Sequence, residues 1–380
     1  MNTRIPSFLS RPVALAAAAL ATALLAAGPA QAAHGVAATA GQADATPSSR
    51  PLPVVASFSI LADLVKQVGG DRVAVESLVK AGGDTHVFQP GPAQVRQLSS
   101  ASLVVVNGLG FEGWMPRLIG SSGYKGPVVE AARGLQAMKA TDDHHHHGDD
   151  ADEDDHDHDG PHGHDHDHDG PHGHDHDEDG PHGHSHADHD HDEASHGHHH
   201  HHHGGLDPHA WQDALNVRHY VANIAEGLCR AAPADCSGFR ERARAYDQKL
   251  LELDQEIHQA VDATPTDRRR VMVSHAAFGY YGRAYHITFM APVGISTEEE
   301  PSAAVVANLI RQARQQNVQA FFFENNSDPR LLKRMASELK NVTIGELYAD
   351  SLSPANGPAA DYLSMMRYNT RVITQALSKK

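Results

Sequence analysis

Four short stretches of this 380-residue chain place a histidine or an aspartate at a predicted junction between a strand, a loop and a helix. Imidazole nitrogens and carboxylate oxygens are ligands of Zn²⁺, and imidazole also suits Cu²⁺ and Ni²⁺, so the chemistry that these residues favour is metal binding. A single loop histidine is usually only a surface residue, and the signal therefore lies in the combination. The stretches are Gly82–Pro90 with His86, Asp207–Trp211 with His209, Val273–Tyr280 with His275, and Tyr348–Ser353 with Asp350.

The segments around these stretches alternate between short strands and helices, which is typical of an α/β fold with a mainly parallel sheet. In such sheets ligands bind outside the carboxyl ends of the strands, where the four stretches fall. The pattern predicts strands over 54–57, 72–79, 103–106, 127–130, 271–274, 318–323 and 342–344, and helices over 60–68, 92–100, 111–119, 213–231, 276–285, 302–316, 329–339 and 362–377.

One longer helix is predicted over 239–263, a segment without Gly or Pro. Its apolar residues recur at intervals of three and four, which favours a single helix with one buried stripe, about 37 Å long. We therefore expect an N-terminal α/β lobe at 51–238, a connecting helix at 239–264 and a C-terminal α/β lobe at 265–380, with the metal site between the lobes. The stripe consists of Ala243, Tyr246, Leu250, Leu253 and Ile257.

Residues 141–205 form a tract of unusual composition, which we call the His tract. It holds 21 of the 48 acidic residues, 25 of the 32 histidines and no Lys or Arg, and Asp-Gly-Pro-His-Gly-His recurs at Asp159, Asp169 and Asp179. Because alanine is its only aliphatic residue, we expect it to be disordered without metal. Imidazoles beside carboxylates suit Zn²⁺, Cu²⁺ or Ni²⁺, so we interpret the tract as a loop that captures or hands over metal. A solubilising acidic spacer is the alternative.

The acidity of the chain arises in this tract. The formal net charge is −17, but outside the tract 31 basic residues stand against 27 acidic ones. A nucleic-acid-binding protein is expected to have a dominant basic face. The sequence therefore indicates no nucleic-acid partner.

The N-terminus has the features of a secretory signal peptide. Arg4 and Arg11 precede the apolar run 13–27, and Ala30-Gln31-Ala32 offers a cleavage site of the usual small-residue type. The apolar run is shorter than the roughly 20 residues that a membrane span needs. We expect residues 1–32 to be cleaved, 33–50 to be a flexible leader and the mature protein to lie in the periplasm. No cysteine stands at the cleavage site, so we expect no lipid anchor.

The chain has two cysteines, Cys229 and Cys236. In an oxidising compartment they favour a disulfide, which would staple the predicted break between two helices. Closing so short a loop stabilises a protein by about 2–3 kcal/mol at most. A metal-binding role is disfavoured because no other thiol is present to complete a sulfur site.

In combination and order, these motifs resemble the metal-binding receptors of ABC importers, the cluster A-I family that captures zinc or manganese. The resemblance runs from Val54 to the last helix and includes further motifs at 295–302 and 324–330. It implies a binding protein rather than an enzyme, with an inner-membrane ABC permease as partner. It also implies that the long helix is a rigid connector between the lobes and that a His-rich loop marks a zinc-type member. The implied ligands are His86 and His209 from the N-terminal lobe and His275 and Asp350 from the C-terminal lobe.

Zinc is the metal that this ligand set favours, because three neutral imidazoles and one carboxylate suit tetrahedral Zn²⁺. Manganese prefers more oxygen ligands, and the family's manganese receptors resemble this chain but carry an acidic residue where His275 stands. We therefore predict a monomeric periplasmic Zn²⁺ receptor. A periplasmic metallochaperone is a second candidate partner.

Three alternatives stay open: a manganese, nickel or copper receptor of the same fold, a zinc hydrolase, and a metal buffer that uses only the His tract. A hydrolase would keep an open metal position, and the sequence lacks His-Glu-x-x-His. Asp350 has a second interpretation, as an acceptor that supports a ligand. Candidate supporting or wall residues are Asp84, Glu112, Trp211 and Asn325, whereas surface or packing positions are expected for His34, His219, His258 and His286.

Overall fold

The computed structural model describes residues 50–140, 205–298 and 300–378. The expected signal peptide and leader up to residue 49, and the His tract from residue 141 to residue 204, lie outside the described residues. No helix in the described part of the chain is both long enough and apolar enough to cross a membrane.

The N-terminal lobe is built on a four-stranded parallel sheet in the order β2-β1-β3-β4. Its central strands β1 and β3 consist mostly of buried Val, Ala and Leu, as expected for parallel strands that are covered on both faces. The strands are β1 (Leu52–Phe58), β2 (Val73–Val79), β3 (Leu103–Val106) and β4 (Val128–Glu130), and the helices between them are α1 (Ser59–Gly69), α2 (Pro92–Ser99) and α3 (Met115–Ser122).

The C-terminal lobe repeats this architecture in a second four-stranded parallel sheet, in the order β6-β5-β7-β8. The predicted α/β fold with two lobes and parallel sheets is thus confirmed. The elements are β5 (Arg270–Val273), α6 (Gly279–Tyr285), β6 (Thr288–Met290), α7 (Ala303–Gln315), β7 (Ala320–Glu324), α8 (Arg330–Ser337), β8 (Thr343–Leu347) and α9 (Tyr362–Ser378).

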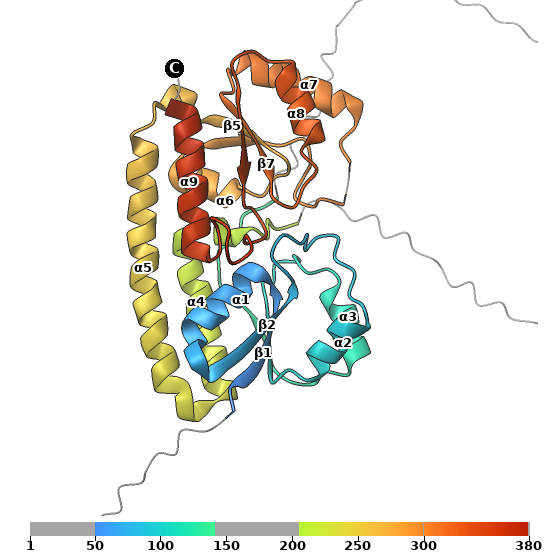
Figure 1. Ribbon diagram of the computed structural model, residues 1–380, viewed down its shortest axis with the longest axis vertical. Coiled ribbons are helices and arrows are strands. Elements are labelled where there is room, and N and C mark those ends of the chain that lie inside the picture. The colour runs from blue at the N-terminus through green and yellow to red at the C-terminus, as the bar shows by residue number, and fades with distance from the viewer. Residues whose placement is uncertain (1–49, 141–204, 299, 379–380) are drawn as a thin grey trace, which may run out of the picture. The chain divides into compact units, whose positions relative to one another are not determined.

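Two long helices follow the N-terminal sheet, α4 (Ala214–Ala231) and α5 (Cys236–Asp262), and the second of them leads to the C-terminal lobe. Helix α5 packs against α1 and α4 along one part of its length and against α9 along another, so it contacts elements of both lobes (Figure 1). Its buried residues include Tyr246, Leu250, Leu253 and Ile257 of the predicted stripe. The division at 238/239 and 264/265 remains our proposal for the domain boundaries.

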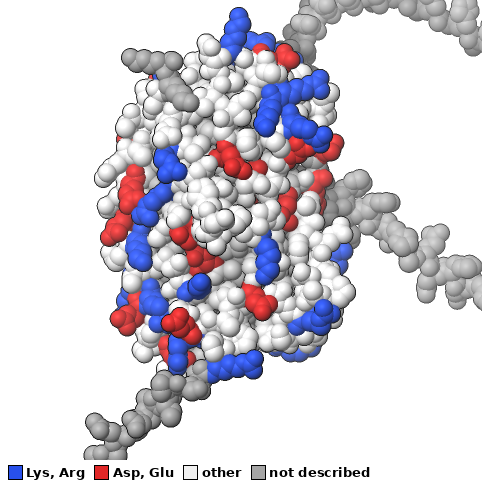
Figure 2. Space-filling view, in the orientation of Figure 1, with Lys and Arg blue, Asp and Glu red and all other residues white. Residues whose placement is uncertain are grey.

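Cys229 and Cys236 form a disulfide at the turn between α4 and α5. Helix α4 ends at Ala231 and α5 begins at Cys236, so the bond closes the connection between two antiparallel helices. Basic and acidic side chains are interspersed over the face shown in Figure 2, as the nearly balanced charge outside the His tract predicts.

The sequence missed one strand and misplaced the starts of two helices. Strand β6 was not predicted, because only two residues separate it from the end of α6. Helix α6 begins at Gly279 rather than at Ala276. Helix α3 begins at Met115 rather than at Phe111, since Glu112 turns inward. The Glu112 carboxylate accepts hydrogen bonds from the Ser57 hydroxyl at 2.6 Å and from the Asn107 backbone N–H at 2.7 Å.

Candidate metal site

The carboxyl ends of the strands in both lobes converge on one buried cluster. His86 lies on the loop after β2, His275 is the second residue after β5, and Asp350 follows β8. His209 lies just before α4, on the segment that returns from the His tract. One potential ligand atom from each of the four side chains lies within 4.8 Å of the others. The structure therefore brings together all four residues that the sequence singled out.

The spacing of these atoms fits a single small cation. His86 Nε2 lies 3.3 Å from His209 Nε2 and 3.4 Å from Asp350 Oδ2. The other Asp350 oxygen, Oδ1, lies 3.6 Å from His209 Nε2, and Oδ2 lies 3.1 Å from His275 Nε2. Ligand atoms about 2.0–2.1 Å from a tetrahedral Zn²⁺ are about 3.3–3.4 Å from one another. These four separations lie close to that value, and all the ligand atoms lie within 4.8 Å of one another.

The ligand atoms are buried and incompletely paired. His209 and Asp350 are 0% exposed and His275 is 1% exposed. Neither carboxylate oxygen of Asp350 has a hydrogen-bond partner of good geometry among the described residues, and neither has His275 Nε2. Buried polar atoms are normally satisfied, so orphaned atoms that face one another indicate a site for an ion. A divalent cation supplies the missing partner for each of them.

His209 is oriented by Asp207. The Asp207 carboxylate Oδ1 accepts hydrogen bonds from His209 Nδ1 at 2.8 Å and from the His209 backbone N–H at 2.9 Å. This fixes the tautomer that leaves Nε2 free for a metal. Gly279 allows the close approach of α6, because a side-chain Cβ there would lie 2.8 Å from Asp207 Oδ2.

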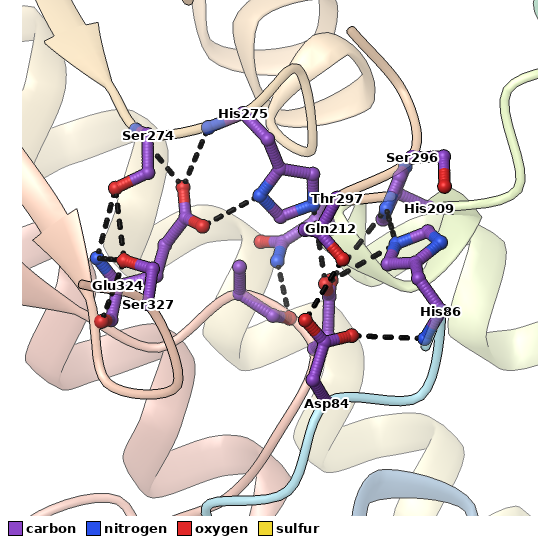
Figure 3. A network of polar contacts seen from close by, with 12 residues as sticks. Asp84, His86, His209, Gln212, Ser274, His275, Ser296, Thr297, Glu324 and Ser327 are labelled. Carbon is purple, nitrogen blue, oxygen red and sulfur yellow. Dashed lines mark hydrogen bonds and ion pairs between the residues drawn. The ribbon is translucent and has the colours of Figure 1, made fainter. Parts of the chain in front are cut away.

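His275 is oriented by Glu324 at the end of β7. Its Nδ1 donates to Glu324 Oε2 at 2.5 Å, while Glu324 Oε1 accepts from the backbone N–H groups of Ser274 and His275 (Figure 3). The hydroxyl of Ser327 also lies beside Glu324 in this view and donates to its backbone carbonyl. The Glu324 carboxylate thus turns His275 Nε2 toward Asp350.

The protonation of the cluster is set by burial and by these carboxylates. Burial lowers the pKa of His86, so this imidazole is neutral at neutral pH. Burial has the same effect on His275, but the charges of Glu324 and Asp350 outweigh it and raise the pKa of His275 well above its usual value. Burial alone would raise the pKa of Asp350, yet His275 and His209 lower it well below its usual range. A cation that binds here takes the place of the His275 proton.

Aromatic and amide side chains form the wall behind the ligands. The Phe111 ring lies 4.9 Å from the His86 ring, and the Trp211 ring lies 5.3 Å from the His209 ring, between centroids. Trp211 Nε1 and Gln212 Nε2 both donate to the Ala349 carbonyl at 2.9 Å, which fixes the backbone next to Asp350. The sequence pattern singled out Trp211 but missed Gln212, because an isolated glutamine at a helix start carries no metal-site signal.

The other candidates have separate roles. Asp84 accepts a hydrogen bond from the backbone N–H of His86, whereas Glu112 braces the loop after β3. The backbone N–H of Asn325 donates to the carbonyl of Leu347 at the end of β8. His219, His258 and His286 also lie outside that cluster, and His34 lies outside the described residues.

Comparison with known proteins supports a transport role. The chain is similar to the manganese ABC transporter substrate-binding lipoprotein PsaA of Streptococcus anginosus, with 26% identity over 350 residues, 90% of this chain and 94% of the relative. It is 25% identical to the manganese-binding lipoprotein MntA of Halalkalibacterium halodurans over 328 residues, 86% of this chain and 89% of the relative.

Among solved structures, the periplasmic zinc-binding protein TroA from Treponema pallidum shares the fold with a TM-score of 0.67 and 23% identity, covering 87% of this chain and 100% of that one. The family model of the periplasmic zinc-uptake complex component A matches residues 54–376. This match confirms the family expected from the motifs, whose members are substrate-binding transport proteins rather than enzymes. The chain belongs to that family and is a substrate-binding protein of a metal ABC importer.

Proposed function

We propose that this protein is a receptor for Zn²⁺ that delivers the ion to the permease of an ABC importer. The observation that carries the proposal is the ligand set, in which three imidazoles, two of them held by carboxylates, meet one further carboxylate. Relatives are named for manganese as well as for zinc, so the choice of metal rests on ligand chemistry. Imidazole nitrogens in a four-ligand arrangement suit Zn²⁺, whereas Mn²⁺ prefers carboxylate and water oxygens in a larger coordination shell.

The expected signal peptide and the family suggest the compartment in which the protein acts and the partner that it meets there. We propose that the receptor acts as a monomer in the periplasm and meets the inner-membrane permease there, with a metallochaperone as a further source of metal. Several relatives are named lipoproteins. We propose that this chain differs from them in carrying no lipid anchor, since its cysteines are Cys229 and Cys236 and both lie in the disulfide.

We further propose that the His tract passes metal to the site. The described residues at its two ends support this, because the Ala140 backbone N–H donates to the Gly205 carbonyl at 2.9 Å and Lys139 pairs with Leu206. These paired ends directly precede Asp207, whose carboxylate holds His209. A metal released near this stem lies only a few residues from a ligand of the cluster.

A titration of two proteins tests the proposal: the full chain and a variant lacking residues 141–204. We expect the variant to keep one tight Zn²⁺ site and the full chain to bind additional, weaker Zn²⁺. Joining Ala140 to Gly205 through Asn-Gly, a two-residue turn that suits a hairpin, keeps the hydrogen bond between these two residues. Calorimetry gives the stoichiometry, and elemental analysis after incubation with equal Zn²⁺ and Mn²⁺ gives the preferred metal. Loss of all tight binding in the variant would identify a buffer, and preferential retention of Mn²⁺ would overturn the choice of zinc.

A further inference from the structure

Among the four ligands, His86 lies farthest along the chain from a helix or strand. It lies on the segment between β2 and α2, within which residues 80–91 form neither helix nor strand. The segment belongs to the N-terminal lobe, whereas two of the other ligands, His275 and Asp350, belong to the C-terminal lobe. Contacts between this loop and the C-terminal lobe are therefore needed to keep His86 close to His275 and Asp350.

Two hydroxyl groups of the C-terminal lobe hold the loop. The Ser351 hydroxyl accepts the backbone N–H of Gly82 at 2.5 Å, at a position with φ of +78° that favours glycine. The Thr297 hydroxyl donates to Asp84 Oδ2 at 2.8 Å. The second oxygen of the same carboxylate, Asp84 Oδ1, accepts the backbone N–H of His86 at 2.9 Å. Thr297 is therefore linked to His86 through a single carboxylate (Figure 3).

Thr297 is also attached to the segment that carries His275. It lies on the loop between β6 and α7, and this loop pairs with the His275 segment through a bridge between His275 and Val293. The Ala276 backbone N–H donates to the Gly294 carbonyl at 3.0 Å in the same place. The bond from Thr297 to Asp84 thus joins the loop of His86 to the loop beside His275.

The two hydroxyl groups that hold the loop, those of Thr297 and Ser351, differ in their burial. Ser351 is buried, whereas Thr297 and Asp84 are each half-buried at the surface where the lobes meet. Within the described residues Asp84 makes no ion pair, so Thr297 and the His86 backbone are its bonded donors. A hydroxyl–carboxylate bond is strong enough to order a loop and is still accessible to a partner that separates the lobes.

We propose that Thr297 is a positioning residue for metal binding, whose hydroxyl holds His86 in the cluster through Asp84 and keeps the metal from leaving. The inference rests on the proposed receptor function and adds a residue that controls how fast the ion is released. When a partner breaks the bond from Thr297 to Asp84, the His86 loop loses one of its two anchors on the C-terminal lobe. His86 is then the first ligand to leave the ion.

Three variants of the full chain test this: Thr297→Val, Thr297→Ser and Ser296→Ala. Valine keeps the shape of Thr297 without its hydroxyl, and serine restores the hydroxyl. Ser296 is the matched control, because its hydroxyl accepts only from Glu298 within its own loop and points away from Asp84 in Figure 3. Each protein is loaded with less than one equivalent of Co²⁺, so that the tightest site fills first, and the absorption of the bound ion is followed after addition of a chelator.

We expect Thr297→Val to release Co²⁺ about tenfold faster than the wild type, since loss of a residue that supports a ligand typically costs 10–100-fold in metal affinity. Thr297→Ser and Ser296→Ala are expected to stay within about twofold of the wild type, and the thermal unfolding temperature of the metal-free variants is expected to change little. Release by Thr297→Val at the wild-type rate, or equal acceleration in Ser296→Ala, would overturn the inference. A wild type that itself holds no Co²⁺ tightly would instead refute the receptor function.

Discussion

Replacing His275 by alanine is expected to raise the dissociation constant for Zn²⁺ by about a hundredfold to a thousandfold. A four-ligand zinc site in a small peptide gains about 10–16 kcal/mol on binding, so one ligand contributes on the order of 3–4 kcal/mol, and each 1.4 kcal/mol corresponds to a factor of ten. His275 also separates the buried carboxylates of Glu324 and Asp350, which would face each other without it. Competition with a chelating dye, using the chain without the His tract, measures the change.

Two further variants test whether the loss of zinc affinity is specific to residues of the cluster. Asp350→Ala removes the fourth ligand and is expected to weaken zinc binding to a similar extent, because neither carboxylate oxygen has another partner in the described structure. His219→Ala removes an exposed histidine on α4 and is expected to leave the affinity unchanged. Unchanged tight binding in both His275→Ala and Asp350→Ala would show that the cluster is not the zinc site.

Zinc binding is expected to weaken by about a hundredfold when the pH falls from about 8 to about 6, which is the effect of one displaced proton per ion. The carboxylates of Glu324 and Asp350 overcome the effect of burial and raise the pKa of His275, so this imidazole carries a proton in the absence of metal. The metal has to displace that proton, and lowering the pH opposes the exchange. Burial lowers the pKa of His86, so this imidazole holds a proton less readily than His275 does.

Calorimetry in two buffers with different ionisation enthalpies counts the protons directly. We expect release of about one proton per Zn²⁺ near neutral pH, and a logarithm of affinity that changes by about one for each pH unit. An affinity that stays constant between these pH values, with no proton released, would mean that His275 is neutral before the metal arrives. The raised pKa assigned to it from the neighbouring carboxylates would then be wrong.

The parts of the fold that the sequence predicted are those with a local signature. Buried strands such as Leu103–Val106 are continuous apolar runs, and the stripe of α5 repeats every three or four residues, so both are visible without tertiary information. Strand β6 follows the end of α6 after only two residues, which hides the change from helix to strand, and the inward turn of Glu112 depends on Ser57 in another strand. Neither feature leaves a local pattern.

The metal ligands could be predicted from the sequence, whereas the residues that hold them in place could not. His86, His209, His275 and Asp350 were identified because their motifs match a family, and their convergence follows from the carboxyl ends of parallel strands. The bond between Glu324 and His275 joins residues 49 positions apart, and that between Thr297 and Asp84 joins residues 213 positions apart. A glutamate or a threonine has no spacing rule that reveals such a partner, so these contacts required the folded chain.

Zinc-edge anomalous scattering from crystals of the zinc-loaded protein locates the ion itself. We expect a strong peak about 2.0–2.2 Å from one nitrogen each of His86, His209 and His275 and from an oxygen of Asp350. A peak at any other place, or imidazoles of these three histidines turned away from the ion, would contradict it.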